Sequence, residues 1–138
     1  MFSNHAQLTI ESGTITATAP IIDNYWGTGI ECYGGDGNIV IKGGSVTAVA
    51  IPSVETSIAR GAGIDGGLIT VTGGTIFARG DNSAILLQTK FESEFILTCS
   101  LDYVNGSESV QETYGPTKDY NYYYKWVQIT PAPVTTTE

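Results

Sequence analysis

Three segments of the chain repeat one ten-residue pattern, and this repeat restricts the available folds more than any other feature of the sequence. The segments are Leu8–Ala17, Ile39–Ala48 and Ile69–Ala78. Each alternates apolar with other residues, reaches a glycine at its sixth position and then alternates again up to an alanine. These glycines, Gly13, Gly44 and Gly74, are 31 and 30 residues apart. A fixed period of this length indicates a repeat architecture.

Each period also holds a third apolar segment, around Ile30, Ile64 and Ile85. Successive side chains of a strand point to opposite faces, so alternation predicts which residues face the core. The predicted inward residues are Leu8, Ile10, Ile15 and Ala17, then Ile39, Ile41, Val46 and Ala48, then Ile69, Val71, Ile76 and Ala78.

Composition supports strands throughout the repeats. Ile and Val together number 24, Leu and Met only 7, and there are 18 Thr residues. Branched side chains suit a pleated sheet better than a helix. Short strands with glycine corners in each period predict an all-β fold, a parallel β-helix (solenoid) of about three to four coils. An antiparallel sandwich is the main alternative, but it gives strands no reason to repeat in sequence.

The composition changes after Leu87. Glycine becomes rare between residues 88 and 125, and six of the eight tyrosines lie there. Phe95–Leu97 can form a degenerate last coil, and Tyr120–Ile129 has the pattern of a longer strand that caps the stack. We therefore predict coils over residues 6–87, a last coil with an aromatic C-terminal cap over 88–130, and a Pro/Thr linker over 131–138. This linker implies further domains in the same parent chain.

Charge excludes several classes of function. Fourteen acids against six bases give a net charge of -8, which argues against nucleic-acid binding because phosphates need clustered Lys and Arg. No apolar run approaches the roughly 20 residues of a membrane span, so membrane insertion is not expected. The one histidine, His5, lies beside the start of the sequence. It is poorly placed for a Ser-His-Asp or Cys-His site, and we predict no catalytic residues.

Cys32 and Cys99 fall about 14 Å apart if three coils separate them. A disulfide needs Cα atoms within about 7 Å, so we expect two buried, unpaired thiols.

Calcium is the metal that the residues suit best. One His and two Cys are too few for a zinc site, whereas calcium takes carboxylate and backbone oxygens. Acids and amides at equivalent corners of the repeats are Asp23, Asn24, Asp81 and Asn82, with Asp36 and Asp65 near the next corner. Asp and Asn also favour turns without any metal, and this second interpretation is the stronger one. Metal ligands therefore stay unassigned.

Aromatic residues give the best signal for a ligand. Tyr25 and Trp26 lie in an insertion between two predicted strands, and Tyr33 follows one strand later. Sugar rings stack their apolar faces on aromatic side chains, so these three are the predicted ligand-binding residues. Alternatively, Trp26 seals an open edge. Rows of outward Thr residues could order ice-like water, but Phe77 and Arg79 interrupt them.

The segment Gly61–Gly67, followed by Ile69–Ile76, resembles carbohydrate-binding-domain β-helix repeats in secreted or surface proteins of gut Firmicutes and cellulolytic clostridia. Tyr124–Thr130 is similar to the strand that ends such domains, and the resemblance covers most of residues 6–130. It implies a right-handed parallel β-helix, a non-catalytic role, and affinity for carbohydrate, with bound calcium in some members.

We therefore expect a non-catalytic domain of a bacterial cell-surface or secreted protein, extracellular or attached to the cell wall. Its expected role is adhesion or carbohydrate binding, with a polysaccharide, a host or bacterial surface glycan, or a protein as partner. The main alternative is a purely structural spacer without a ligand. A minority alternative is a polysaccharide-cleaving enzyme, which would need a carboxylate pair from Asp36, Asp65 and Asp81, with Arg60 or Arg79 beside it.

Overall fold

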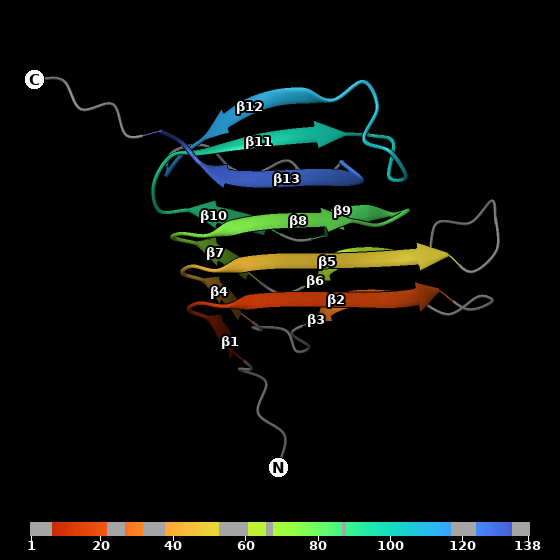
Figure 1. Cartoon of the computed structure of the whole chain (residues 1–138), viewed down its shortest axis with the longest axis horizontal. Helices are drawn as coiled ribbons and strands as arrows, with labels where there is room; N and C mark the ends of the chain where they lie inside the picture. Colours follow the sequence, from red (N-terminus) through yellow and green to blue (C-terminus); the bar gives the residue numbers. More distant parts are fainter. Residues whose placement is uncertain are drawn as a thin grey trace, which may run out of the picture.

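A computed structural model of the chain describes residues 7–21, 27–31, 38–52, 61–65, 68–86, 88–116 and 124–133. The regular elements of this part are all β-strands, and none of it forms a helix long and apolar enough to cross a membrane. The strands group into three sheets (Figure 1), called A, B and C below.

Sheets A and C contain only parallel strands. Sheet A has the order β1 (Gln7–Ile10), β4 (Asn38–Ile41), β7 (Leu68–Val71) and β10 (Gln88–Phe91). Sheet C has the order β3 (Gly27–Glu31), β6 (Gly61–Asp65) and β9 (Ser83–Ile85). Each repeat therefore gives one strand to each of these sheets.

Sheet B is mixed. Its strands β2 (Thr14–Ile21), β5 (Ser45–Pro52) and β8 (Thr75–Arg79) are parallel to one another. Beyond β8 come β13 (Trp126–Pro131), β11 (Phe95–Ser100) and β12 (Val110–Tyr114), each antiparallel to the strand before it. The segment from the end of the chain thus lies between two strands that precede it in sequence.

The prediction of a right-handed parallel β-helix, or solenoid, is wrong, although the chain is all-β as predicted. The structure has three sheets, one of them mixed. The predicted degenerate coil required Phe95–Leu97 to lie beside β8, but β13 occupies that place and pairs Ile129 with Ile76. β13 can replace β11 there because both strands alternate apolar and polar residues, so either can continue the inner face.

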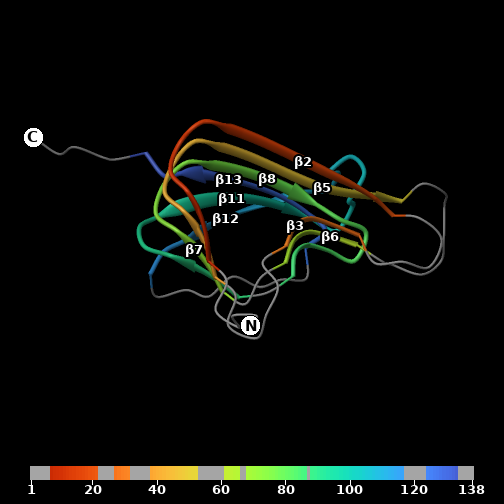
Figure 2. The ribbon, with the colours of Figure 1, turned by 90° about the horizontal axis from the view of Figure 1, so that it is seen from below.

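The core lies on the inner side of sheet B, toward sheets A and C (Figure 2). The predicted inward residues of the second and third repeats are confirmed, since all are at most 2% exposed. In the first repeat the prediction holds less well. Ile10 is buried, Ile15 and Ala17 are half-buried, and Leu8 is 38% exposed.

Glycine corners set the register between repeats. Gly13, Gly44 and Gly74 have φ angles of 87°, 82° and 83°, a region that residues with a side chain rarely adopt. Each corner precedes a strand of sheet B, and backbone hydrogen bonds connect the corner of one repeat to the corner of the next. The amide of Ser45 donates to the carbonyl of Gly13 (2.8 Å), and that of Thr75 donates to the carbonyl of Gly44 (3.0 Å).

Sheet C touches the backbone of sheet B through a glycine. A Cβ atom on Gly63 would lie 2.6 Å from the carbonyl oxygen of Ala48 in β5 and 2.7 Å from that of Ala84 in β9. No larger residue fits there unless the strands separate, which explains the glycine at this point of the repeat.

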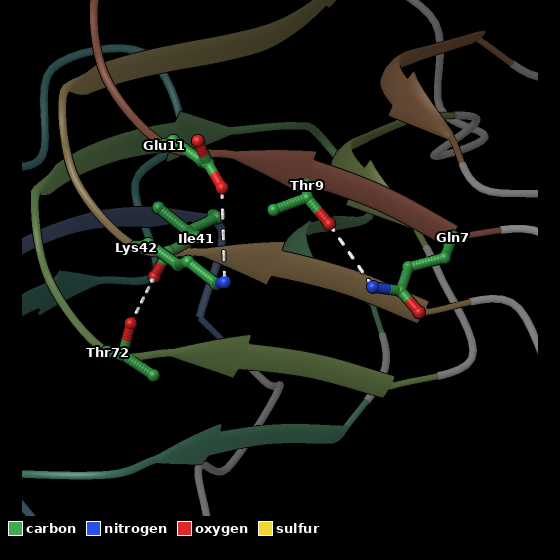
Figure 3. A network of polar contacts seen from close by, with 6 residues as sticks. All are labelled: Gln7, Thr9, Glu11, Ile41, Lys42 and Thr72. Atoms are coloured by element: carbon green, nitrogen blue, oxygen red, sulfur yellow. Dashed lines mark hydrogen bonds and ion pairs between the residues drawn. The ribbon is translucent and has the colours of Figure 1, made fainter.

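The outer side of sheet A carries isolated polar contacts (Figure 3). Lys42 and Glu11 form an ion pair at 4.0 Å, and Gln7 donates to the hydroxyl of Thr9 at 3.2 Å. The hydroxyl of Thr72 donates to the carbonyl of Ile41 at 3.4 Å. Exposed pairs of this kind contribute little to stability. The stability of sheet A therefore comes mainly from its row of buried inward side chains, such as Ile41 and Val71.

We predict that Gly74→Ala destabilises the protein more than Gly13→Ala. Both changes force alanine into the left-handed region at a cost of about 1–2 kcal/mol. At Gly74 the new Cβ would also lie 2.8 Å from the backbone carbon of Gly43, whereas at Gly13 nothing lies within 4 Å. Urea unfolding of both variants measures the difference. An equal loss of unfolding free energy in the two variants would show that the backbone at Gly43 can move away from the new Cβ atom without a measurable loss of stability.

The inward row of sheet A that runs through Leu8, Ile39 and Ile69 ends in a polar residue, Thr89. It is fully buried, and no described residue forms a hydrogen bond with its hydroxyl. An unsatisfied buried polar group costs about 1–3 kcal/mol. We predict that Thr89→Val raises the free energy of unfolding by about 1 kcal/mol, while Thr70→Val on the outer side of the same sheet changes it by less than about 0.5 kcal/mol. A loss of stability in Thr89→Val would mean that this hydroxyl has a partner in solution.

Candidate functional site

The outer face of sheet B carries hydroxyl and amide side chains and very little charge. One row crosses the whole sheet in register and consists of Thr16, Thr47, Phe77, Gln128, Thr98 and Gln111. Neighbouring strands lie about 4.8 Å apart, so this row is about 24 Å long. Among the described residues of these strands, alternation places one ionised side chain on this face, that of Arg79.

A groove of about 250 Å³ lies over β5, β8 and β13 in the middle of this face. The outward side chains that line this sheet-B groove are Ser45, Thr47, Thr75, Phe77, Gln128 and Thr130. Repeat strands supply one wall and the C-terminal strand supplies the other. The groove therefore exists only because β13 pairs with β8.

One aromatic residue, Phe77, lines the groove, and a second, Trp126, lies beside Phe77. The rings of Phe77 and Trp126 are 5.4 Å apart at 81°, an edge-to-face contact, and both side chains are half-buried. Gly106 lies against the indole of Trp126, because a Cβ atom there would be 2.5 Å from the ring. The aromatic pair is thus held from one side by the connection between β11 and β12.

That connection is itself well ordered by hydrogen bonds. The carboxylate of Asp102 accepts from the amides of Val104 (3.0 Å) and Asn105 (3.3 Å) and from the hydroxyl of Ser107 (2.7 Å). These bonds, the one from Ser107 first, lower the pKa of Asp102 below its usual 3.8. The connection is also tied to β8, because Arg79 donates to the carbonyls of Tyr103 (3.3 Å) and Val104 (3.1 Å).

A second cavity, of about 500 Å³, lies beneath this connection. Its walls include Asp102, Glu108, Val110 and Tyr124. Glu108 has a φ of 52°, which is uncommon for a residue with a side chain. Burial, then the charge of Glu112, raises the pKa of Tyr124, so its hydroxyl stays protonated at neutral pH. Since three donors already occupy Asp102, Glu108 is the carboxylate that this cavity offers.

Acids also meet at the end of sheet C. Asp65 lies opposite Glu31 in register, and its pKa is raised by burial first and by Glu31 second. Calcium needs six to eight oxygen ligands, and the described residues contain no group of three acidic, Cys or His side chains that could hold a metal. Asp23, Asn24 and Asp36 lie outside the described residues, so calcium binding stays a prediction.

The three predicted ligand-binding residues are not placed by the structure. Tyr25, Trp26 and Tyr33 all lie outside the described residues, so that site remains a prediction. Cys32 lies outside them too, whereas Cys99 is fully buried on β11.

The sheet-B groove was not predicted, although part of its signal was visible. The outward pairs Ser45/Thr47 and Thr75/Phe77 follow from alternation within the repeats. Gln128 and Thr130 complete the groove from a strand whose partner the sequence does not indicate.

Comparisons with protein-family models, curated proteins and solved structures found no match.

We predict that the β11–β12 connection loosens in acid because of Asp102. A lowered pKa stabilises the folded form fully above the usual value of 3.8, and this contribution is lost as the pH falls through the lowered pKa. The amide signals of Val104 and Asn105, and the indole signal of Trp126, should therefore shift together in an NMR titration below pH 3.8. Asp102→Asn should abolish this common transition and Glu108→Gln should keep it. An unchanged titration in Asp102→Asn would assign the transition to another group.

Proposed function

We propose that the chain is a non-catalytic domain that binds a neutral glycan chain on the outer face of sheet B. The observation that carries the proposal is the sheet-B groove, where Phe77 lies among hydroxyl and amide groups and contacts the neighbouring ring of Trp126. Sugars present apolar C–H faces, which pack on aromatic rings, and hydroxyls, which bond to uncharged polar side chains. Gln128 offers both a donor and an acceptor for this purpose.

The charge distribution favours a neutral ligand. The protein has a net charge of -8, which repels uronates and sialylated glycans at long range. The cation on this face, Arg79, already donates to two backbone carbonyls. An anionic sugar would therefore find little electrostatic attraction at the groove to offset the long-range repulsion. A neutral sugar would not be repelled.

The lining of the groove favours binding over hydrolysis. Glycoside hydrolysis uses two carboxyl groups about 5 Å or about 7–9 Å apart, one of them with a raised pKa. The residues that line the groove are neutral at physiological pH. Among the described residues that line the groove, none is an acid or base that could transfer a proton to a glycan seated there.

The wider setting belongs to the same proposal. A bacterial surface or secreted protein, extracellular or wall-attached, would use such a face for adhesion to polysaccharide. This part rests on the resemblance of the repeat motifs and on the Pro/Thr composition of residues 131–138. Tyr25, Trp26 and Tyr33 would then act as a second contact region for the same or another glycan.

Binding to an array of plant, host and bacterial glycans, followed by calorimetry, tests the proposal. We expect binding to neutral chains, with at least a tenfold loss in Phe77→Ala and in Gln128→Ala. Thr70→Ala, on the outer side of sheet A, is the matched control and should bind as the parent does. Melting curves show whether each variant is folded.

Two results would overturn the assignment to the groove. Loss of binding in Trp26→Ala but not in Phe77→Ala or Gln128→Ala would move the site to the predicted aromatic residues. Absence of binding to every glycan, with and without calcium, would contradict the proposal and favour the structural spacer.

A further inference from the structure

All three sheets end at the same side of the molecule. β1, β2 and β3 are the terminal strands of sheets A, B and C, and they lie together at the N-terminal end (Figure 1). We propose that this end is a self-association surface, at which β2 pairs antiparallel with β2 of a second copy of the chain. The proposal is independent of glycan binding.

At this end no described strand lies beyond β1, β2 or β3, and the exposure of the first repeat differs accordingly from that of the second. Leu8 is 38% exposed, whereas its register partner in the next repeat, Ile39, is 1% exposed. Ile15 is half-buried, whereas its partner Val46 is 1% exposed. Equivalent positions thus become fully buried wherever another layer lies beside them. Apolar surface left in water at one end favours association.

The free edge of β2 carries hydrogen-bonding groups on alternate residues. The amide of Ser45 donates to the carbonyl of Gly13, so the odd-numbered residues of this segment bond toward β5. In a parallel ladder the intervening residues face the other way. The backbone groups of Thr14, Thr16 and Thr18 therefore point to the open edge, and no described strand pairs with them. Pro20, which lacks an N–H, falls in the same set, where that loss breaks no bond to β5.

Charge is what makes a second copy the best-suited occupant. Thr14–Ile21 contains no ionised residue, although natural edge strands are often protected by charge. The opposite edge strand of sheet B, β12, carries Glu112 and follows Glu108. In a protein of net charge -8, two copies repel each other less where the uncharged edges of β2 meet than where charged edges meet.

One register satisfies both the backbone and the faces. If Thr16 lies opposite Thr16 of the second copy, then Thr14 lies opposite Thr18, and these are the residues whose backbone groups point to the edge. Ile15 then lies opposite Ala17 on the inner side, so the apolar strip continues across the interface. The edge strands hold four, eight and five residues. Stable interfaces use about 20–30 residues a side, so we expect a dimer that dissociates on dilution.

Sedimentation velocity and light scattering over a range of concentrations test this proposal. The parent protein should shift from monomer toward twice that mass as its concentration rises. Thr16→Pro should stay monomeric, because it removes the central outward N–H and no bond to β5. Thr16→Lys should also stay monomeric, because it places two ammonium groups opposite each other.

The control is Thr113→Lys, which adds the same charge on the other edge strand of sheet B and should keep the dimer. Phe77→Ala should also keep it, which separates this test from that of glycan binding. Circular dichroism and melting curves identify any variant that fails to fold. A parent protein that is monomeric at every concentration would overturn the proposal. So would a dimer that survives both Thr16 variants, or one that Thr113→Lys disrupts equally.

Discussion

The left-handed glycines at 13, 44 and 74 are the constraint on which the rest of the structure depends. Each lets the chain leave sheet A and enter sheet B at the same point of the repeat, and the carbonyls of Gly13 and Gly44 accept from the amides of Ser45 and Thr75 in the next layer. A slip of one residue would exchange the two faces of every strand that follows. By fixing the register, the corners therefore determine both which side chains are buried and which lie on the outer face.

The inner face of sheet B contributes the buried core, and its outer face carries the groove of the proposed glycan binding. Inward positions such as Val46 and Ile76 are almost fully buried, whereas outward positions such as Thr16, Gln128 and Thr130 are exposed. Many of those positions carry uncharged polar groups, and the aromatic pair Phe77 and Trp126 lies among them. The connection that holds Asp102 and Gly106 fixes this aromatic pair from above, so the groove is formed before any ligand arrives.

Sequence alternation was sufficient for the inward residues of the second and third repeats, because their faces depend on local pattern and fixed corners. It failed at the mixed part of sheet B, because Phe95–Leu97 and Val127–Ile129 have the same alternation and local pattern does not choose between them. The groove was missed for the same reason, since two of its five polar side chains, Gln128 and Thr130, come from β13. The predicted aromatic site around Trp26 lies outside the described residues and stays a prediction.

The position of β13 also has a consequence for biosynthesis. β13 lies between β8 and β11, although both precede it in sequence. A nascent chain can join β11 and β12, but their hairpin has no place on the sheet until residues 126–131 emerge from the ribosome. Throughout that interval the edge of β8 is unpaired and open to other strands. Chains that stop before β13 would therefore be prone to aggregate, because β13 is the strand that joins the two parts of sheet B.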